Sequence, residues 1–95
     1  MFKNIVKVAN FDGVKNQFII YTGNQGTYFQ SYNSIIARRY KGKIYLDRNT
    51  WDYSVTTGKY RNRFLGDSGI NETRAKIKSG EYILTDLNKW YFSDW

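Results

Sequence analysis

The side chains that most often perform catalysis or bind metals are absent from this sequence or scattered along it. The 95 residues include no histidine and no cysteine, which removes the commonest general base, the commonest metal ligand and all thiolate chemistry. Catalysis would then need a carboxylate pair holding a metal, or a serine or threonine activated by lysine. The carboxylates show no ligand spacing: Asp12, Asp47, Asp52, Asp67, Glu72, Glu81, Asp86 and Asp94. We therefore predict a protein that is not an enzyme, with no catalytic residues, no metal site and no cofactor.

Positive charge is concentrated in one segment of the chain. The formal net charge is +7, and the segment 38–63 alone holds eight basic residues against two acidic ones, Asp47 and Asp52. The basic residues are Arg38, Arg39, Lys41, Lys43, Arg48, Lys59, Arg61 and Arg63. Such an asymmetry favours an anionic partner. The plain alternative is a solvated face that only keeps the protein soluble.

Aromatic residues are interleaved with these cations. Cations neutralise phosphates, and flat rings stack on unpaired bases, at ~1–3 kcal/mol per base. Tyr, Trp and Arg also dominate the hot spots of protein–protein interfaces. We predict one basic and aromatic binding face made of Arg38, Arg39, Lys41, Lys43, Tyr45, Arg48, Trp51, Lys59, Arg61 and Arg63. For Trp51, Tyr60 and Phe64, packing in the core is the competing interpretation.

Runs of β-branched and aromatic residues predict the sheet that would carry this face. We place the strands at residues 4–9, 16–22, 28–37, 43–47 and 81–87, with the turn Asp12-Gly13 between the first two and a potential break near Asn33. Alternation in the fourth strand puts Ile44 and Leu46 on one face, and Lys43, Tyr45 and Asp47 on the other. The side chains expected to face a helix are Val6, Val8, Phe18, Ile20, Ile44, Leu46 and Ile83, with Tyr60 and Phe64 as further candidates.

One short helix is predicted, over about residues 71–79. Asn71 is a suitable N-cap and Gly80 is placed to end the helix. Residues 48–67 fit either a helix or a strand, because a spacing of four brings Tyr60 and Phe64 onto one face in both, with Lys59 and Arg63 pointing outward. The expected fold class is α+β: a single domain, residues 1–95, with an antiparallel sheet of about five strands and one C-terminal helix.

The C-terminal residues 89–95 form an aromatic tail that carries Trp90, Tyr91, Phe92 and Trp95. The tail either packs back onto the sheet or contacts a partner, which includes a second copy in a homo-oligomer. The longest uninterrupted apolar run, residues 18–21, is too short for a membrane span or a signal-peptide core. We therefore expect a cytoplasmic protein without a membrane partner.

Several runs of unusual residues together resemble a known family. They are YFQSYNSIIA at 28–37, IYLD at 44–47, WDYS at 51–54, TTGKYRNRFL at 56–65, IKSG at 77–80 and ILT at 83–85. In order and spacing they resemble a family of small uncharacterised proteins carried by phages, plasmids and other mobile elements of Gram-positive bacteria. The resemblance covers about residues 27–88 and brings no catalytic residues. It implies an accessory role in a mobile element.

Two functions remain open on this basis. In the first, the protein binds a host protein or nucleoprotein complex in the host cytoplasm and inhibits a defence or nucleic-acid-handling machine, in the manner of anti-CRISPR proteins. In the second, it is a stand-alone DNA- or RNA-binding protein that uses its basic and aromatic face. Small size and the implied origin favour the first, since a compact binder needs no active site. The sequence leaves the identity of the partner open.

Overall fold

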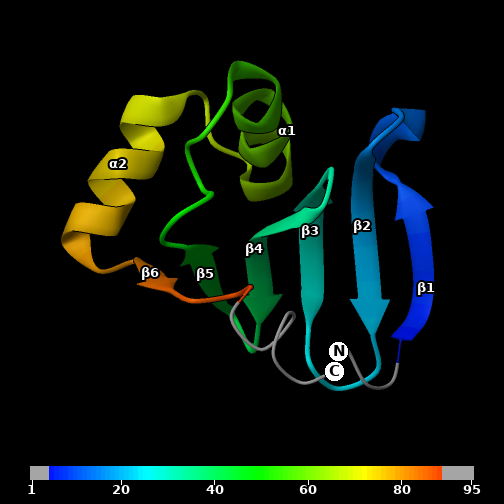
Figure 1. The fold of residues 1–95 in the computed structure, drawn as a ribbon. Coiled ribbons are helices and arrows are strands. Elements are labelled where there is room, and N and C mark those ends of the chain that lie inside the picture. Colours follow the sequence, from blue (N-terminus) through cyan, green and yellow to red (C-terminus); the bar gives the residue numbers. More distant parts are fainter. Residues whose placement is uncertain (1–4, 89–95) are drawn as a thin grey trace.

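Six strands form one sheet in the computed structural model, which describes residues 5–88 (Figure 1). They lie side by side in chain order: β1 (Ile5–Asn10), β2 (Gln17–Thr22), β3 (Thr27–Ser31), β4 (Ser34–Tyr40), β5 (Lys43–Asp47) and β6 (Tyr82–Thr85). A short 3₁₀ turn, η1 (Phe11–Gly13), joins the first two. The strands β1 to β5 pair antiparallel, whereas β6 pairs parallel to β5. A parallel pair needs a crossover connection, and α1 (Val55–Leu65) with α2 (Ile70–Ser79) supplies it.

The α+β class is confirmed, but its details differ from the prediction. The sheet of residues 5–88 has six strands and is mixed, where about five antiparallel strands were expected, and there are two helices where one was expected. The strand predicted over 28–37 divides into β3 and β4. Its break lies at Tyr32, whose positive φ of 54° turns the chain beside Asn33. Ser31 then pairs with Ser34 across a two-residue turn.

Helix α1 occupies the region that the sequence left undecided. Ser54 caps it by accepting a hydrogen bond from the Thr57 N–H at 3.0 Å, and it ends at Gly66, whose φ is 77°. Tyr60 and Phe64 are buried while Lys59 and Arg63 are exposed, as the four-residue spacing predicts.

Helix α2 confirms the predicted helix to within one residue, since it spans Ile70–Ser79 and ends at Gly80. Its start differs from the prediction, because Gly69 is the N-cap and Asn71 lies inside the first turn. Glu72, in the first turn, makes the side-chain hydrogen bonds at this helix start. Its carboxylate accepts hydrogen bonds from the backbone N–H and the hydroxyl of Ser68, both at 2.9 Å.

These contacts of Glu72 predict part of the acid sensitivity of the fold. The Ser68 backbone N–H, then the side chains of Lys76 and Ser68, lower the pKa of Glu72 from an ordinary value of 4.5 to about 2. A lowered carboxyl pKa stabilises the fold above the unfolded value, and that contribution is lost as pH falls toward the folded value. We expect Glu72→Gln to lose less unfolding free energy than the wild type between pH 4.5 and pH 2. Urea unfolding across this range measures it, and parallel curves would contradict the assignment.

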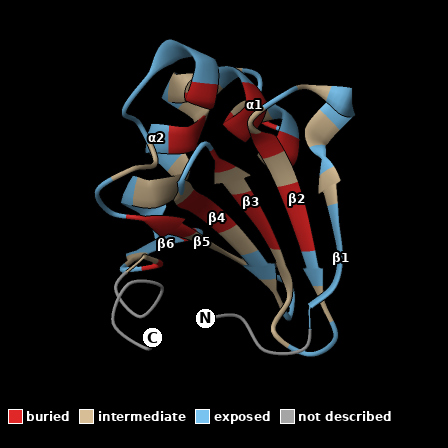
Figure 2. Cartoon of the chain, turned by 45° about the vertical axis from the view of Figure 1, so that its right-hand side comes forward, coloured by how far each residue is buried: buried red, intermediate tan, exposed pale blue. Residues whose placement is uncertain are grey.

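The core lies mainly between the helices and the facing side of the sheet. It contains Ile19, Phe29, Ile36, Ala37, Leu46, Tyr60, Phe64 and Tyr82, and Phe29 stacks on Phe64 with ring centroids 5.8 Å apart. A smaller cluster on the other face holds Ile20, Tyr28, Ile35 and Leu87. Figure 2 shows the buried residues concentrated in the middle strands, with β1 mostly exposed.

Part of the predicted core is therefore wrong. Leu46 is buried and Ile44 packs against the main cluster, as expected. In contrast, Val6, Val8 and Ile83 are exposed. Val8 pairs with Ile20 on the face away from the helices, and β1 is an edge strand, so little covers it. Alternation puts Phe18 on that same far face, and there it is half-buried. Ile83 pairs with Tyr45 on the far face as well.

Candidate binding site around helix α1

The ten residues predicted to form one binding face are divided among different parts of the molecule. Arg38, Lys43 and Tyr45 lie on the sheet face away from the helices, and Lys41 lies in the β4–β5 turn. Arg39, Lys59 and Arg63 lie on the helix side. Arg48 is exposed just after β5, Trp51 is half-buried against the main core, and Arg61 of α1 is buried. The single face is therefore corrected, because neighbouring strand residues point to opposite sides of a sheet.

On the far face of the sheet, the Arg38 cation contacts three tyrosine rings. The Arg38 guanidinium lies over the rings of Tyr28, Tyr40 and Tyr45, at 5.4, 4.2 and 5.8 Å from their centroids. Its Nε donates to the Gln25 carbonyl at 2.8 Å. Burial raises the pKa of Tyr28, and the charge of Arg38 opposes that shift. Tyr45, predicted for the binding face, is half-buried in this cluster.

Arg61 is the clearest correction, since its side chain is only 1% exposed. Its Nη1 donates to the Trp51 carbonyl at 2.7 Å and its Nη2 to the Asn62 Oδ1 at 2.9 Å. The guanidinium also lies over the Trp51 ring, 5.3 Å from the centroid. Trp51 is half-buried and packs against the main core, so the core interpretation holds for it. The spacing 57, 60, 61, 64 of the buried residues is helical, and it would have placed Arg61 inside once α1 was recognised.

Arg39 and Arg63 converge on one cleft from two different elements, β4 and α1. We define this cationic cleft, of about 300 Å³, by its lining residues Phe11, Ile19, Tyr21, Thr27, Arg39, Arg63 and Phe64. The Arg39 guanidinium lies 4.6 Å from the Phe64 ring centroid and donates to the Phe64 carbonyl. The Arg63 guanidinium lies 5.3 Å from the Tyr60 centroid and binds the Asp12 carboxylate at 2.8 Å.

Two lysines extend the positive charge around the cationic cleft. Lys7 lies over the Tyr21 ring at 5.9 Å, and Lys59 lies over the Tyr60 ring at 5.5 Å. Neither lysine has an ion-pair partner among residues 5–88. The prediction missed Lys7, Phe11 and Tyr21 because they lie outside the basic segment. The predicted first hairpin did not reveal this pair, because a turn at Asp12-Gly13 would set Lys7 opposite Phe18, whereas the observed pairing sets it opposite Tyr21.

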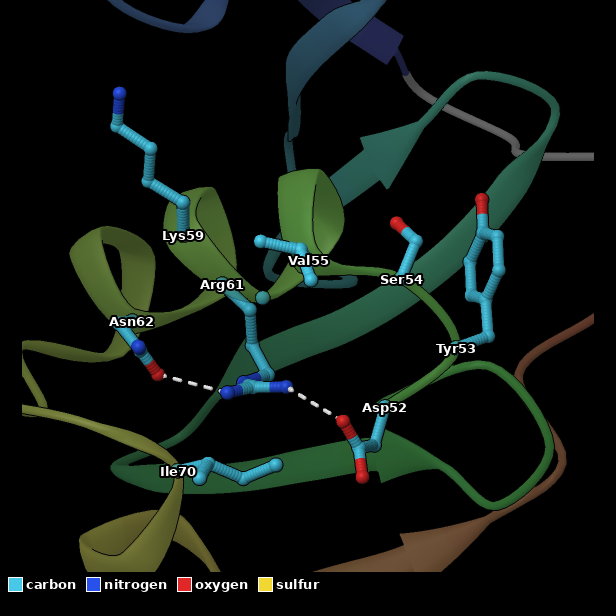
Figure 3. A pocket seen from close by; sticks show the side chains of 9 residues that line it. Asp52, Tyr53, Ser54, Val55, Lys59, Arg61, Asn62 and Ile70 are labelled. Atoms are coloured by element: carbon cyan, nitrogen blue, oxygen red, sulfur yellow. Dashed lines mark hydrogen bonds and ion pairs between the residues drawn. The ribbon is translucent and has the colours of Figure 1, made fainter.

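A second cavity lies against the other side of α1, with a volume of about 640 Å³ (Figure 3). Its lining residues are Asp52, Tyr53, Ser54, Val55, Gly58, Lys59, Arg61, Asn62 and Ile70. In Figure 3, the Arg61 guanidinium lies between Asn62 and Asp52, and the Lys59 side chain extends away from them. We call this space the Arg61 cavity. The sequence did not predict this cavity, although its lining includes residues from the runs at 51–54 and 56–65.

Two findings on the described residues concern membranes and metals. No helix there is long and apolar enough to cross a membrane, and no three potential metal ligands come together between residues 5 and 88. The aromatic tail, residues 89–95, lies outside the described residues. Its predicted packing or partner contact, including a homo-oligomer, stays a prediction.

Comparison with known proteins gives a family and little else. A model described as a family of unknown function (DUF8033) matches residues 4–80. Neither a curated protein nor a solved structure matches the chain. The match spans both cavities around α1, because all of their lining residues fall between Phe11 and Ile70.

Proposed function

The chain belongs to the DUF8033 family, a family of unknown function, and for it we propose a non-catalytic binding function. It acts as an accessory protein of a mobile element inside the host cell. It docks on a host defence or nucleic-acid-handling machine and inhibits that machine, as anti-CRISPR proteins do. The proposal joins the resemblance described above to one structural observation, the cationic cleft.

The cationic cleft supports recognition of an anionic surface on a partner. Arg39 and Arg63 each stack on an aromatic ring of α1, so less side-chain freedom remains to be lost on binding. A guanidinium has five N–H donors, and each of these arginines uses only some of them in hydrogen bonds within the described part of the chain. The remaining donors suit carboxylate or phosphate oxygens, which arginine binds in a two-pronged geometry.

A protein or nucleoprotein partner fits this surface better than bare nucleic acid does. Few cations line the cleft, and binding of bare nucleic acid at physiological salt rests on many phosphate contacts. An exposed aromatic side chain, Tyr21, lines the cleft beside the cations. Rigid aromatic area beside arginine is typical of protein hot spots. Affinity would then come from these contacts, with the cations selecting an acidic partner surface.

Affinity capture from host lysate, with and without nuclease, tests this proposal. Tagged protein should retain a host protein that stays bound after nuclease treatment. A cleft variant, Lys7→Ala/Arg63→Ala, should recover much less of that protein. Retention that nuclease abolishes would instead favour direct binding of nucleic acid. The proposal fails if the wild type and the cleft variant retain the same proteins in the same amounts.

Direct binding of single-stranded nucleic acid is the second candidate, and Tyr21 is the observation that favours it. Tyr21 is 41% exposed, and Lys7 lies over its ring, beside the cationic cleft. An exposed ring with a neighbouring cation can stack a base and hold its phosphate. If all four cations around the cleft contact phosphates, at about −0.7 each, log affinity should fall against log salt with a slope of about −3. Fluorescence anisotropy with a labelled oligonucleotide measures that slope. A flat salt dependence would exclude this candidate.

A further inference from the structure

The Arg61 cavity is built almost wholly by one continuous segment. Eight of its nine lining residues lie between Asp52 and Asn62, and the ninth is Ile70. Its volume of about 640 Å³ falls in the range of small-molecule sites, roughly 300–1,000 Å³. The walls combine an aromatic ring and aliphatic side chains with polar groups, as such sites usually do.

Arg61, which lines this cavity, is a buried cation whose compensation is incomplete. Two of its nitrogens donate to the Trp51 carbonyl and to Asn62. Its Nε is buried and has no hydrogen-bond partner among the described residues. The nearest carboxylate, Asp52, lies 3.9 Å from Nη1. Burial lowers the pKa of Arg61, and Asp52 opposes the shift. A buried charge gains strongly from a further counter-charge, so the cavity favours an anion.

The surrounding charges fit a phosphate group. Arg61 contributes one positive charge to the lining, and Asp52 contributes one negative charge. The Lys59 ammonium extends away from both and lies over the Tyr60 ring. Arg74 binds Asp52 at 3.3 Å from outside the lining and adds a second positive charge. The sum of Arg61, Arg74 and Asp52 is +1, which attracts the ≈ −1.5 to −2 charge that a phosphate monoester carries at neutral pH. Ser54 also places the positive end of α1 at the cavity.

Gly58 places no side chain beside the Arg61 guanidinium, which is itself only 1% exposed. Glycine inside a helix is less favourable than alanine, so its place in α1 is not explained by helix stability. A Cβ at position 58 would lie 3.6 Å from both Nη atoms of Arg61. That is ordinary contact, without a clash. An alanine would therefore fit the helix and cover the guanidinium.

We propose that the Arg61 cavity binds the phosphate monoester of a nucleotide, either free or at the 5′ end of a strand. Arg61 holds the phosphate, and the apolar wall of Tyr53, Val55 and Ile70 contacts the sugar and base. The cavity is larger than a phosphate alone requires, and Tyr53 and Val55 are exposed, Val55 at 92%. Asp52 accepts from a ribose hydroxyl. This site goes beyond the proposed docking function and is separate from the cationic cleft.

Calorimetric titration of the full chain tests the site with five probes: inorganic phosphate, uridine 5′-monophosphate, uridine, and hexauridylate with and without a 5′-phosphate. We expect the monophosphate to bind at least about tenfold more tightly than uridine. Equal affinity for the monophosphate and the 5′-phosphorylated hexamer means that the site recognises only the 5′-terminal nucleotide. If the 5′-phosphorylated hexamer binds more tightly than both the monophosphate and the 5′-hydroxyl hexamer, the site recognises the 5′-phosphorylated end of a strand. Either result supports the site, whereas equal binding of uridine and its monophosphate overturns it.

Gly58→Ala separates this site from a general loss of structure. We expect at least a tenfold loss of monophosphate affinity with an unchanged or higher unfolding midpoint, because alanine favours the helix. Thr56→Ala is the matched control, since Thr56 is exposed on the same helix and does not line the cavity. It should bind like the wild type. Full affinity in Gly58→Ala would overturn the proposal.

A direct spectroscopic readout needs no variant. The Arg61 Nε–H resonance should shift when uridine 5′-monophosphate is added and stay unchanged with uridine. An unmoved Arg61 resonance at saturating monophosphate would overturn the assignment. Lys7 and Arg63 do not line this cavity, so the cleft variant should bind the monophosphate normally. Failure of the docking proposal and failure of this site are thereby distinguishable.

Discussion

Replacing Asp67 with alanine should cost about 3–5 kcal/mol of unfolding free energy, the loss typical of breaking a buried ion pair. The Asp67 side chain is fully buried, at 0% exposure. It accepts hydrogen bonds from the Thr73 hydroxyl at 2.7 Å, the Tyr82 hydroxyl at 2.9 Å and the Lys76 ammonium at 2.9 Å. One carboxylate thus ties the end of α1 to both α2 and β6.

The alanine variant would leave these three donors without their acceptor. Burial, and next the hydrogen bond to Asp67, raises the pKa of Tyr82 to about 12, so its hydroxyl keeps its proton and donates to Asp67 at neutral pH. A domain of this size has a total stability near ~5–10 kcal/mol, so the variant should be close to unfolding at room temperature. Urea unfolding followed by circular dichroism measures the loss.

Asp86→Ala is the matched control for this prediction. Asp86 pairs with Arg48 at 3.0 Å on the surface, and exposed pairs contribute about 0–1 kcal/mol. A loss below 1 kcal/mol in Asp67→Ala, or similar losses in both variants, would contradict the role given to Asp67.

The sequence predicted local alternation well and long-range placement poorly. Ile44 and Leu46 point to the helices and Tyr45 points away, as a period of two requires. Val8 was misplaced because alternation alone does not say which face of a hairpin meets a helix. Ile83 was misplaced for a related reason, since β6 pairs parallel to β5 and its facing depends on the crossover before it.

The candidate site depended on the same missing information. Arg61 was placed on the binding face because residues 48–67 could not be assigned to a helix or a strand. As part of α1, it joins the buried row of Thr57, Tyr60 and Phe64. Arg39 and Lys7 lie far apart in the chain, on β4 and β1. They lie around one cleft because Lys7 pairs with Tyr21, Tyr21 with Thr27, and Thr27 with Arg39 across the sheet. Such a cluster needs the whole sheet order to be known.

The second large effect is expected at the cationic cleft. The double variant Lys7→Ala/Arg63→Ala should lose at least ~2 kcal/mol of partner binding, about 30-fold in affinity. Lys7 and Arg63 are both exposed, and the ion pair of Arg63 with Asp12 is a surface pair. Stability should therefore change by no more than about 1 kcal/mol, so that the binding loss reports on the cleft.

Lys43→Ala/Arg48→Ala is closely matched to this cleft variant. Lys43, like Lys7, is exposed and has no ion-pair partner in the described part of the chain. Arg48, like Arg63, is exposed and pairs with one surface carboxylate. Both double variants remove two positive charges. The control residues lie in the basic segment that the sequence singled out, away from the cleft.

The most direct test is the affinity of these three proteins, wild type and both double variants, for the host factor recovered after nuclease treatment. Calorimetry or interferometry at one physiological salt concentration measures it. We expect the cleft variant to bind at least about 30-fold more weakly, and the control variant to remain within about threefold of the wild type. Equal losses in both variants, or a larger loss in the control, would contradict docking through the cationic cleft.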